Sequence, residues 1–235
     1  MIVCLDSGNS RIKWGVHDGK QWLAQGAVAH AEVEQLQRLV SDWPHPAKVM
    51  LANVAGVEAG KRIREQLAPW LPVFSEARSE AARCGVTNRY RHPGQLGVDR
   101  WCALIGARGF GRTAAIVVMA GTATTIDTLD ADGNFLGGLI LPGTELMRRS
   151  LATDTAALPF AAGRHVDYPR CTDDAIVTGC IEAQVGAIER AFARVANASC
   201  LLSGGNAEWI GRFLVIPHVV THNLPLEGLR RLALE

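Results

Sequence analysis

The hydrophobic and polar positions of the chain follow the same order twice. Residues 2–28 predict an apolar strand, a tight turn at Gly8, a second strand, an Asp-Gly turn and a third strand. Residues 116–141 repeat this order around Gly121, again with an Asp-Gly turn before the third strand. Gly8 and Gly121 lie about half the chain apart, so we predict an internal duplication.

Each predicted set of strands is followed by helices that alternate with strands, as judged from apolar residues at helical spacing. The expected helices are at 32–43, 57–67, 96–108, 144–151 and 173–195, with strands at 48–54 and 199–202, a loop at 152–170, and a final helix, strand and helix. Thr172 is the predicted N-cap of the long helix. This order favours an α/β fold with two ribonuclease-H-like, actin-like domains, 1–112 and 113–235, and a cleft between them.

Composition excludes several classes of protein without changing this picture. The chain has 235 residues, of which 48% are hydrophobic and 20% are charged, as in ordinary globular proteins and unlike disordered chains. A formal net charge of +1 gives no overall field for nucleic acid or an acidic membrane. The six cysteines lack zinc spacing, no secretion signal leads the chain, and no uncharged run would cross a bilayer. We therefore expect a cytoplasmic protein with reduced thiols and neither a nucleic-acid nor a membrane partner.

The first glycine turn contains residues suited to phosphate binding. Gly8 permits a tight turn whose backbone N–H groups, together with Asn9 and Ser10, can face phosphate oxygens. Asp6 ends the preceding strand and could hold Mg²⁺ directly or through water, and Lys13 on the next strand adds a positive charge. The same residue types are also common in plain hairpin turns.

The second turn strengthens the phosphate-binding interpretation. Gly121-Thr122-Ala123-Thr124-Thr125 repeats a small, hydroxyl-rich turn after an equivalent strand. Two such turns would hold the β- and γ-phosphates of a nucleotide. Ser203-Gly204-Gly205-Asn206, after a later strand, could then approach the adenosine.

Asp99 and Arg100 open a predicted helix. A carboxylate beside a cleft can accept the proton of a substrate hydroxyl, and a neighbouring arginine can hold a carboxylate or phosphate. The alternative is that Asp99 only caps the helix and Arg100 points to solvent.

Over nearly the whole chain, these motifs resemble the type III pantothenate kinases, enzymes of the acetate-and-sugar-kinase/hsp70/actin superfamily. The resemblance rests on the order and spacing of four motifs. They are Asp6-Ser-Gly-Asn-Ser, Tyr90-x-x-Pro93-x-x-Leu96-Gly97-Val-Asp99-Arg100, Gly121-Thr-Ala-Thr-Thr and Gly137-Gly138-x-Ile140-x-Pro142-Gly143.

The resemblance implies ATP-dependent phosphorylation of pantothenate to 4′-phosphopantothenate, the first step of coenzyme A synthesis, with Mg²⁺ and with Asp99 as general base. It also implies a homodimer with shared sites, in which Thr172 contacts substrate across the interface. The implied ATP-binding residues are Asp6, Ser7, Gly8, Asn9, Ser10, Arg11, Ile12, Lys13, Gly121 and Thr122. The implied pantothenate-binding residues are Tyr90, Gly97, Val98, Asp99, Arg100 and Thr172.

Met119 departs from the family pattern, which carries an aspartate two residues before the second Gly-Thr to help hold K⁺ or NH₄⁺. A thioether does not ligate such a cation, so the requirement is lost, another oxygen replaces the carboxylate, or activity is reduced. Two other functions stay open: a non-catalytic nucleotide-binding accessory factor of the same fold, and a kinase for another hydroxyl-bearing substrate such as a sugar.

Overall fold

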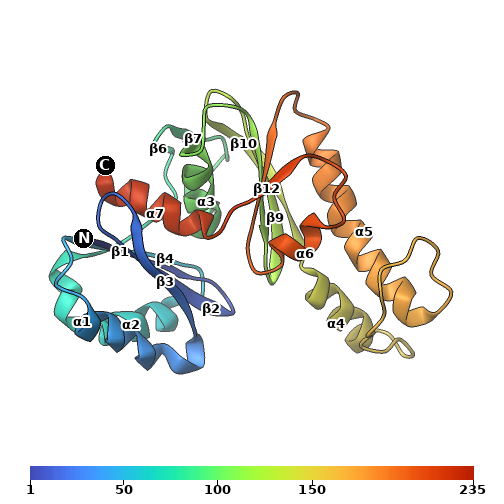
Figure 1. The fold of residues 1–235 in the computed structure, drawn as a ribbon, viewed down its shortest axis with the longest axis horizontal. Coiled ribbons are helices and arrows are strands. Elements are labelled where there is room, and N and C mark those ends of the chain that lie inside the picture. Colours follow the sequence, from blue (N-terminus) through green and yellow to red (C-terminus); the bar gives the residue numbers. More distant parts are fainter. The chain divides into compact units, whose positions relative to one another are not determined.

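The computed structural model describes residues 1–235, which divide into two units by their internal contacts. Unit 1 comprises residues 1–111, 133–135 and 223–235, and unit 2 comprises residues 112–132 and 136–222. Each unit is built on a mixed sheet covered by helices (Figure 1). The predicted α/β class is therefore confirmed.

The sheet of unit 1 begins with the predicted three-stranded set. Strands β1, β2 and β3 are antiparallel neighbours, β4 is parallel to β1, and β5 is parallel to β4, giving the order β3-β2-β1-β4-β5. Their bounds are β1 Ile2–Ser7, β2 Arg11–His17, β3 Trp22–Ala29, β4 Lys48–Asn53 and β5 Phe74–Glu76. A short antiparallel pair follows, β6 Ala82–Arg83 and β7 Val86–Asn88.

Helices cover both faces of this sheet. The α-helices of unit 1 are α1 Gln37–Asp42, α2 Val57–Gln66, α3 Val98–Arg108 and α7 Leu224–Leu234, and its 3-10 helices are η1 His30–Leu36, η2 Ala68–Val73 and η3 Pro93–Gln95. Val3 and Leu5 of β1 face a core made with Leu36, Ile63 and Trp70. Side chains alternate along a strand, so Cys4 and Asp6 face the opposite side, where α7 packs on β1 and α3 packs on α7 (Figure 1).

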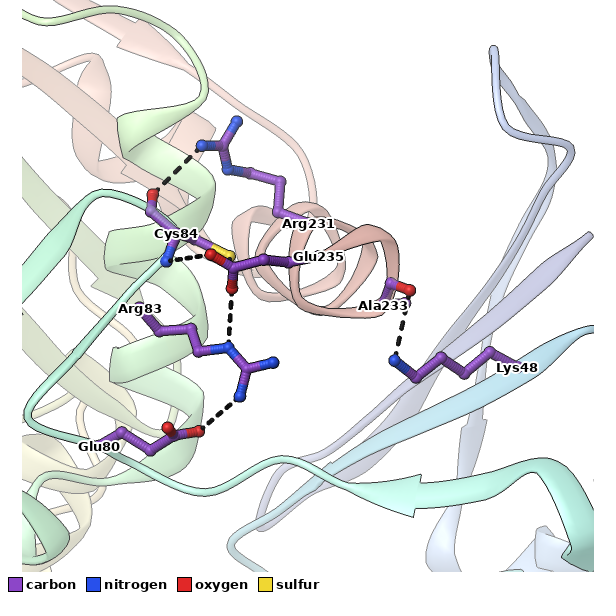
Figure 2. Close-up of polar contacts among 7 residues, drawn as sticks. All are labelled: Lys48, Glu80, Arg83, Cys84, Arg231, Ala233 and Glu235. Atoms are coloured by element: carbon purple, nitrogen blue, oxygen red, sulfur yellow. Dashed lines mark hydrogen bonds and ion pairs between the residues drawn. The ribbon is translucent and has the colours of Figure 1, made fainter.

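Helix α7 is joined to the rest of unit 1 by polar contacts near its end (Figure 2). The Glu235 carboxylate accepts a hydrogen bond from Arg83 Nε at 2.7 Å and another from the Cys84 thiol at 3.2 Å. Arg231 donates to the Cys84 carbonyl at 3.3 Å. By these contacts the C-terminal helix lies in unit 1, whereas the sequence assigns it to a second domain at 113–235. The helix returns because its apolar face covers β1.

Unit 2 repeats the arrangement. Its strands are β8 Ala115–Ala120, β9 Ala123–Leu129, β10 Asn134–Pro142, β11 Ser199–Ser203 and β12 His218–Val220, in the order β12-β11-β8-β9-β10. The first two residues of β10 belong to unit 1, where they pair with β7. Strands β8 and β9 are antiparallel, and β11 and β12 are parallel to β8. The helices are α4 Thr144–Asp154, α5 Thr172–Phe192 and α6 Ala207–Gly211. Ile116 and Val118 of β8 form a core with Ile181 and Ile188 of α5.

Most predicted elements are present, but several boundaries differ. Helix α4 continues to Asp154, three residues into the predicted loop at 152–170, and α5 ends at Phe192 instead of 195. In place of one helix at 32–43, residues 30–36 form a 3-10 segment with non-helical torsion angles at Glu32, and a short α-helix follows at 37–42. Helix α3 starts at Val98, since Gly97 is its N-cap and Leu96 is extended. Helix α5 starts at Thr172 itself, so the prediction of Thr172 as N-cap is wrong; Cys171 occupies that position with no side-chain capping bond.

All six cysteines are free, and Cys4, Cys102, Cys180 and Cys200 are buried. None of the helices combines the length and apolar character needed to cross a membrane.

Candidate active site

Asp6 and Asp99 lie close enough in unit 1 for the charge of Asp99 to act on Asp6. Asp6 is the penultimate residue of β1, on the sheet face that α7 covers, and Asp99 lies in the first turn of α3. The negative charge of Asp99 is one of the causes that raise the pKa of Asp6. Cys102 lies one helical turn after Asp99. Its pKa is raised by burial and, to a smaller extent, by the charges of both carboxylates. The fold therefore places two carboxylates from distant parts of the sequence in one region.

Asp6 is an unusual carboxylate. Its side chain is 7% exposed, and its Oδ1 has no hydrogen-bond partner. Burial raises the pKa of Asp6 from 3.8 to about 7; the charge of Lys13, its partner across the β1–β2 ladder, opposes the rise, and that of Asp99 adds to it. A buried carboxylate oxygen without a donor is suited to a divalent cation or to a water bound to one. The residues present thus fit the predicted Mg²⁺ role of Asp6.

The turn after Asp6 presents its polar groups outward. The Gly8 N–H donates to the Arg11 carbonyl at 3.1 Å, which closes the loop between β1 and β2. Asn9, Ser10 and Arg11 are exposed. Ile12, by contrast, is fully buried in the hydrophobic core. Of the predicted ATP-binding stretch, Ile12 can therefore offer a ligand only its backbone.

Arg100 is held beside two aromatic rings. Its side chain is 5% exposed, so the alternative in which it points to solvent is wrong. Nη1 donates to the Tyr90 hydroxyl at 3.1 Å, and the guanidinium carbon lies 5.8 Å from the ring centroids of both Tyr90 and Phe135. Asn88 holds this loop, because its Oδ1 accepts from the Tyr90 N–H and its Nδ2 donates to the Pro93 carbonyl.

Gly97 leaves room for the Asp99 carboxylate. A Cβ added at Gly97 would lie 2.6 Å from Asp99 Oδ1, so a larger residue would displace this carboxylate. The same oxygen accepts the Arg100 N–H at 2.8 Å. Val98, which lies between Gly97 and Asp99 in the sequence and is the first residue of α3, is half-buried. The structure thus brings Tyr90, Gly97, Asp99 and Arg100 together.

The second glycine turn lies in unit 2, where backbone groups of two other loops hydrogen-bond to it and to the end of β8. The Gly143 N–H donates to the Thr122 carbonyl at 2.8 Å, and the Asn206 N–H donates to the Ala120 carbonyl at 3.0 Å. Gly204 has φ +104°, and a Cβ there would overlap the Ala120 carbonyl. The loop after β11 therefore lies against the turn between β8 and β9. Gly121 is half-buried and Thr122 is exposed.

Met119 and Thr172 occupy different parts of unit 2. Met119 is paired with Thr125 across β8 and β9, and the buried Thr125 hydroxyl has no hydrogen-bond partner. Thr172 is exposed at the start of α5. It lines a cavity of about 580 Å³ between α4 and α5, together with Leu151 and Ile176.

The comparison with known sequences decides the family. The sequence profile described as "Type III pantothenate kinase" matches residues 2–194. The chain is 72% identical over 237 residues to the type III pantothenate kinase of Dechloromonas aromatica, with all of both chains covered. The chain belongs to the type III pantothenate kinases. The kinase of the same description from Aromatoleum aromaticum is 52% identical, over all of this chain and 98% of the relative.

Solved structures place this type III pantothenate kinase in the actin-like fold. A conserved Baf family protein of Campylobacter jejuni superimposes with a TM-score of 0.63 at 18% identity, covering 97% of this chain and 96% of the other. The activator of 2-hydroxyisocaproyl-CoA dehydratase from Clostridium difficile, solved with bound ADPNP, has a TM-score of 0.52 at 11% identity, covering 99% and 92%. These likenesses concern the fold alone.

Three residues near the predicted site of this type III pantothenate kinase were not predicted from the sequence. Phe135 comes from the second half of the chain and reaches the Arg100 cluster through the pairing of β10 with β7. Asn88 lies two residues before Tyr90, and its position in the motif could have singled it out. His30 contacts the Gly8 turn after an intervening hairpin, which no local pattern reveals.

Proposed function

We propose that the chain catalyses ATP-dependent phosphorylation of pantothenate to 4′-phosphopantothenate in the cytoplasm. Full-length identity of 72% to the type III pantothenate kinase of D. aromatica carries this proposal. The Asp6–Asp99 pair and the arginine beside them supply groups suited to phosphoryl transfer.

Asp99 is the proposed general base. Its carboxylate accepts the proton of the primary hydroxyl of pantothenate as the hydroxyl oxygen attacks the γ-phosphorus, and ADP leaves. The narrow space at Gly97 and the bond from the Arg100 N–H orient this carboxylate. Arg100, held by Tyr90, offers a buried positive charge that suits the carboxylate of pantothenate. Val98 is proposed to line the same site.

The Gly8 turn is the proposed phosphate site of unit 1. The backbone N–H groups of its exposed residues, with Ser10 and Arg11, can bind phosphate oxygens, and Lys13 adds a positive charge across the ladder from Asp6. Asp6 is proposed to hold Mg²⁺ directly or through water, and the metal would neutralise charge on the phosphates when bound. In unit 2, the Gly121-Thr122 turn is proposed to bind ATP phosphates as well.

The Met119 side chain does not fit the expected K⁺ or NH₄⁺. Cations of this kind take oxygen ligands, and the side chain at this position offers a thioether. We therefore propose that phosphoryl transfer by this chain does not depend on a monovalent cation held at residue 119.

A homodimer is the proposed assembly. Leu136 and Ile140 of β10 and Leu146 of α4 are 56%, 65% and 40% exposed, and the cavity beside Thr172 is lined mainly by apolar residues. Exposed apolar side chains in one region are typical of a subunit interface. A second copy of the chain would cover them. Sedimentation equilibrium should therefore give twice the chain mass, and Ile140→Asp should shift the species toward monomer; a wild-type monomer at assay concentration would contradict the dimer.

Asp99→Asn tests the proposed mechanism. The variant keeps the shape of the side chain but cannot accept the hydroxyl proton, so kcat should fall on the order of 10²-fold or more. Asp42→Asn, at an exposed aspartate of α1 in the same unit, is the matched control and should keep wild-type kcat. The measurement is steady-state ADP release with pantothenate and Mg-ATP. Unchanged turnover by folded Asp99→Asn would eliminate Asp99 as the base.

A further inference from the structure

His30 is the side chain that contacts the Gly8 turn. It follows β3 directly, and Ala29, the last residue of β3, pairs with Arg11 at the start of β2. His30 therefore lies beside the loop that joins β1 to β2. Its Nε2 lies 2.7 Å from the carbonyl oxygen of Gly8.

The chemistry of this contact assigns the hydrogen. A backbone carbonyl can only accept, so His30 Nε2 carries the hydrogen and donates it to the Gly8 oxygen. The imidazole is half-buried, whereas the next residues of the turn, Asn9 and Ser10, are exposed. The bond thus holds the inner side of the turn and leaves its outer side open to a ligand.

Holding the Gly8 carbonyl also determines where the Asn9 N–H points. The peptide unit is planar and trans, so the C=O of Gly8 and the N–H of Asn9 point in opposite directions. Gly8 lacks a Cβ, and rotation of this peptide meets little steric resistance. A Cβ built at Gly8 would meet only the Arg11 carbonyl, at 3.7 Å. The backbone alone therefore restricts the peptide weakly, and the bond from His30 selects one orientation.

We propose that His30 is a positioning residue for nucleotide binding: its hydrogen bond to the Gly8 carbonyl orients the Asn9 N–H toward the nucleotide phosphates. The proposal rests on the proposed function, because it needs the Gly8 turn to bind phosphate. It assigns to His30 an effect on nucleotide affinity and none on the pantothenate site, where Asp99 and Arg100 lie.

Two substitutions of nearly equal length separate donation from packing. Glutamine at residue 30 retains an N–H donor, and methionine does not. We expect His30→Met to raise the Kd of a Mg-bound, non-hydrolysable ATP analogue about tenfold, the effect of losing one hydrogen bond. His30→Gln should stay near the wild-type Kd, as measured by isothermal titration calorimetry. In steady state, His30→Met should raise KM for ATP and leave KM for pantothenate unchanged.

A ligand-free readout and a control complete the test. In ¹⁵N-labelled protein without nucleotide, the Asn9 amide resonance should shift in His30→Met and stay near its wild-type position in His30→Gln. His45→Met is the matched control, since His45 also contacts a carbonyl, that of Pro46 at 3.0 Å, but precedes the start of β4 at the other end of the sheet. This control should keep wild-type nucleotide affinity.

Each remaining outcome counts against a defined part of the account. If wild type binds the analogue and folded His30→Met binds it equally well, the positioning role of His30 is overturned while the proposed function stands. If wild type binds no analogue, the proposed function and this inference fail together. If His30→Met does not fold, His30→Gln decides, because reduced nucleotide affinity in that folded variant would overturn the inference.

Discussion

The two glycine turns occupy equivalent places in the two units but are held in different ways. In unit 1 the Gly8 carbonyl accepts a hydrogen bond from the side chain of His30. In unit 2 the turn is held by backbone: Gly143 donates to the Thr122 carbonyl, and the loop at Gly204 packs directly on Ala120. Besides the backbone bond from Gly8 to Arg11, the first turn is thus held by a side chain, whereas the second depends on glycines that permit close approach.

The strand positions before the turns differ as well. Asp6 and Met119 each lie two residues before the turn glycine; Asp6 pairs with Lys13, whereas Met119 pairs with Thr125. One copy thus has a buried carboxylate opposite a half-buried lysine where the other has a thioether and a hydroxyl. The equivalent strand positions therefore differ in charge: unit 1 has two ionisable side chains there, and unit 2 has two uncharged ones.

We expect the largest effect from Asp6→Asn, which removes the buried carboxylate that precedes the turn glycine in unit 1 and has no counterpart at the equivalent position of unit 2. The pKa of Asp6 is about 7 in the folded protein against an ordinary value of 3.8, so the folded state holds a proton that the unfolded state releases between these values. The free energy of unfolding should therefore decrease as pH rises from about 4 to about 7. Asp6→Asn removes this loss, and its stability relative to wild type should increase by up to about 4 kcal/mol over that window.

Urea unfolding at several pH values, without divalent cations, measures this difference. Met119→Leu is the matched control at the equivalent position of unit 2, and its stability relative to wild type should not change with pH. Parallel pH profiles for Asp6→Asn and wild type would contradict the burial of an ionisable Asp6.

The next effect compares the glycines of the two turns. Gly204→Ala places a Cβ against the Ala120 backbone at φ +104° and should lower the free energy of unfolding by about 2–3 kcal/mol. Gly8→Ala meets only an ordinary contact at 3.7 Å and should change it by less than about 1 kcal/mol. Thermal unfolding of both variants measures the contrast, and equal losses would show that the two turns are held alike.

Features of the fold and of the candidate site could be predicted from the sequence where a short, local residue pattern carries them. The Asp6 and Gly121 turns, the Asp99 motif and the repeated strand order follow from short patterns, and the predicted elements are present. The position of α7 does not follow from such a pattern, because an amphipathic helix shows that one of its faces packs on the protein but not on which sheet. His30 and Phe135 reach their partners only through strand pairing, so their roles required the structure.

We expect the smallest effect on stability from Glu235→Gln, at the end of α7. Glu235→Gln weakens the contacts of α7 with Arg83 and Cys84, but these side chains are largely open to solvent, so the melting temperature should fall only slightly and kcat should stay unchanged. Glu145→Gln, which loses an exposed pair with Arg149 in unit 2, is the matched control. A large loss of stability in Glu235→Gln alone would mean that α7 depends on its last residue.

The most direct test of the central claim is ADP release by the purified protein with Mg-ATP, with and without pantothenate, in sodium, potassium and ammonium buffers of equal ionic strength. The account predicts pantothenate-dependent release at the same rate in all three buffers, because Met119 provides no oxygen for a monovalent cation. Folded protein that binds nucleotide but shows no pantothenate-dependent release in any buffer would contradict the kinase assignment.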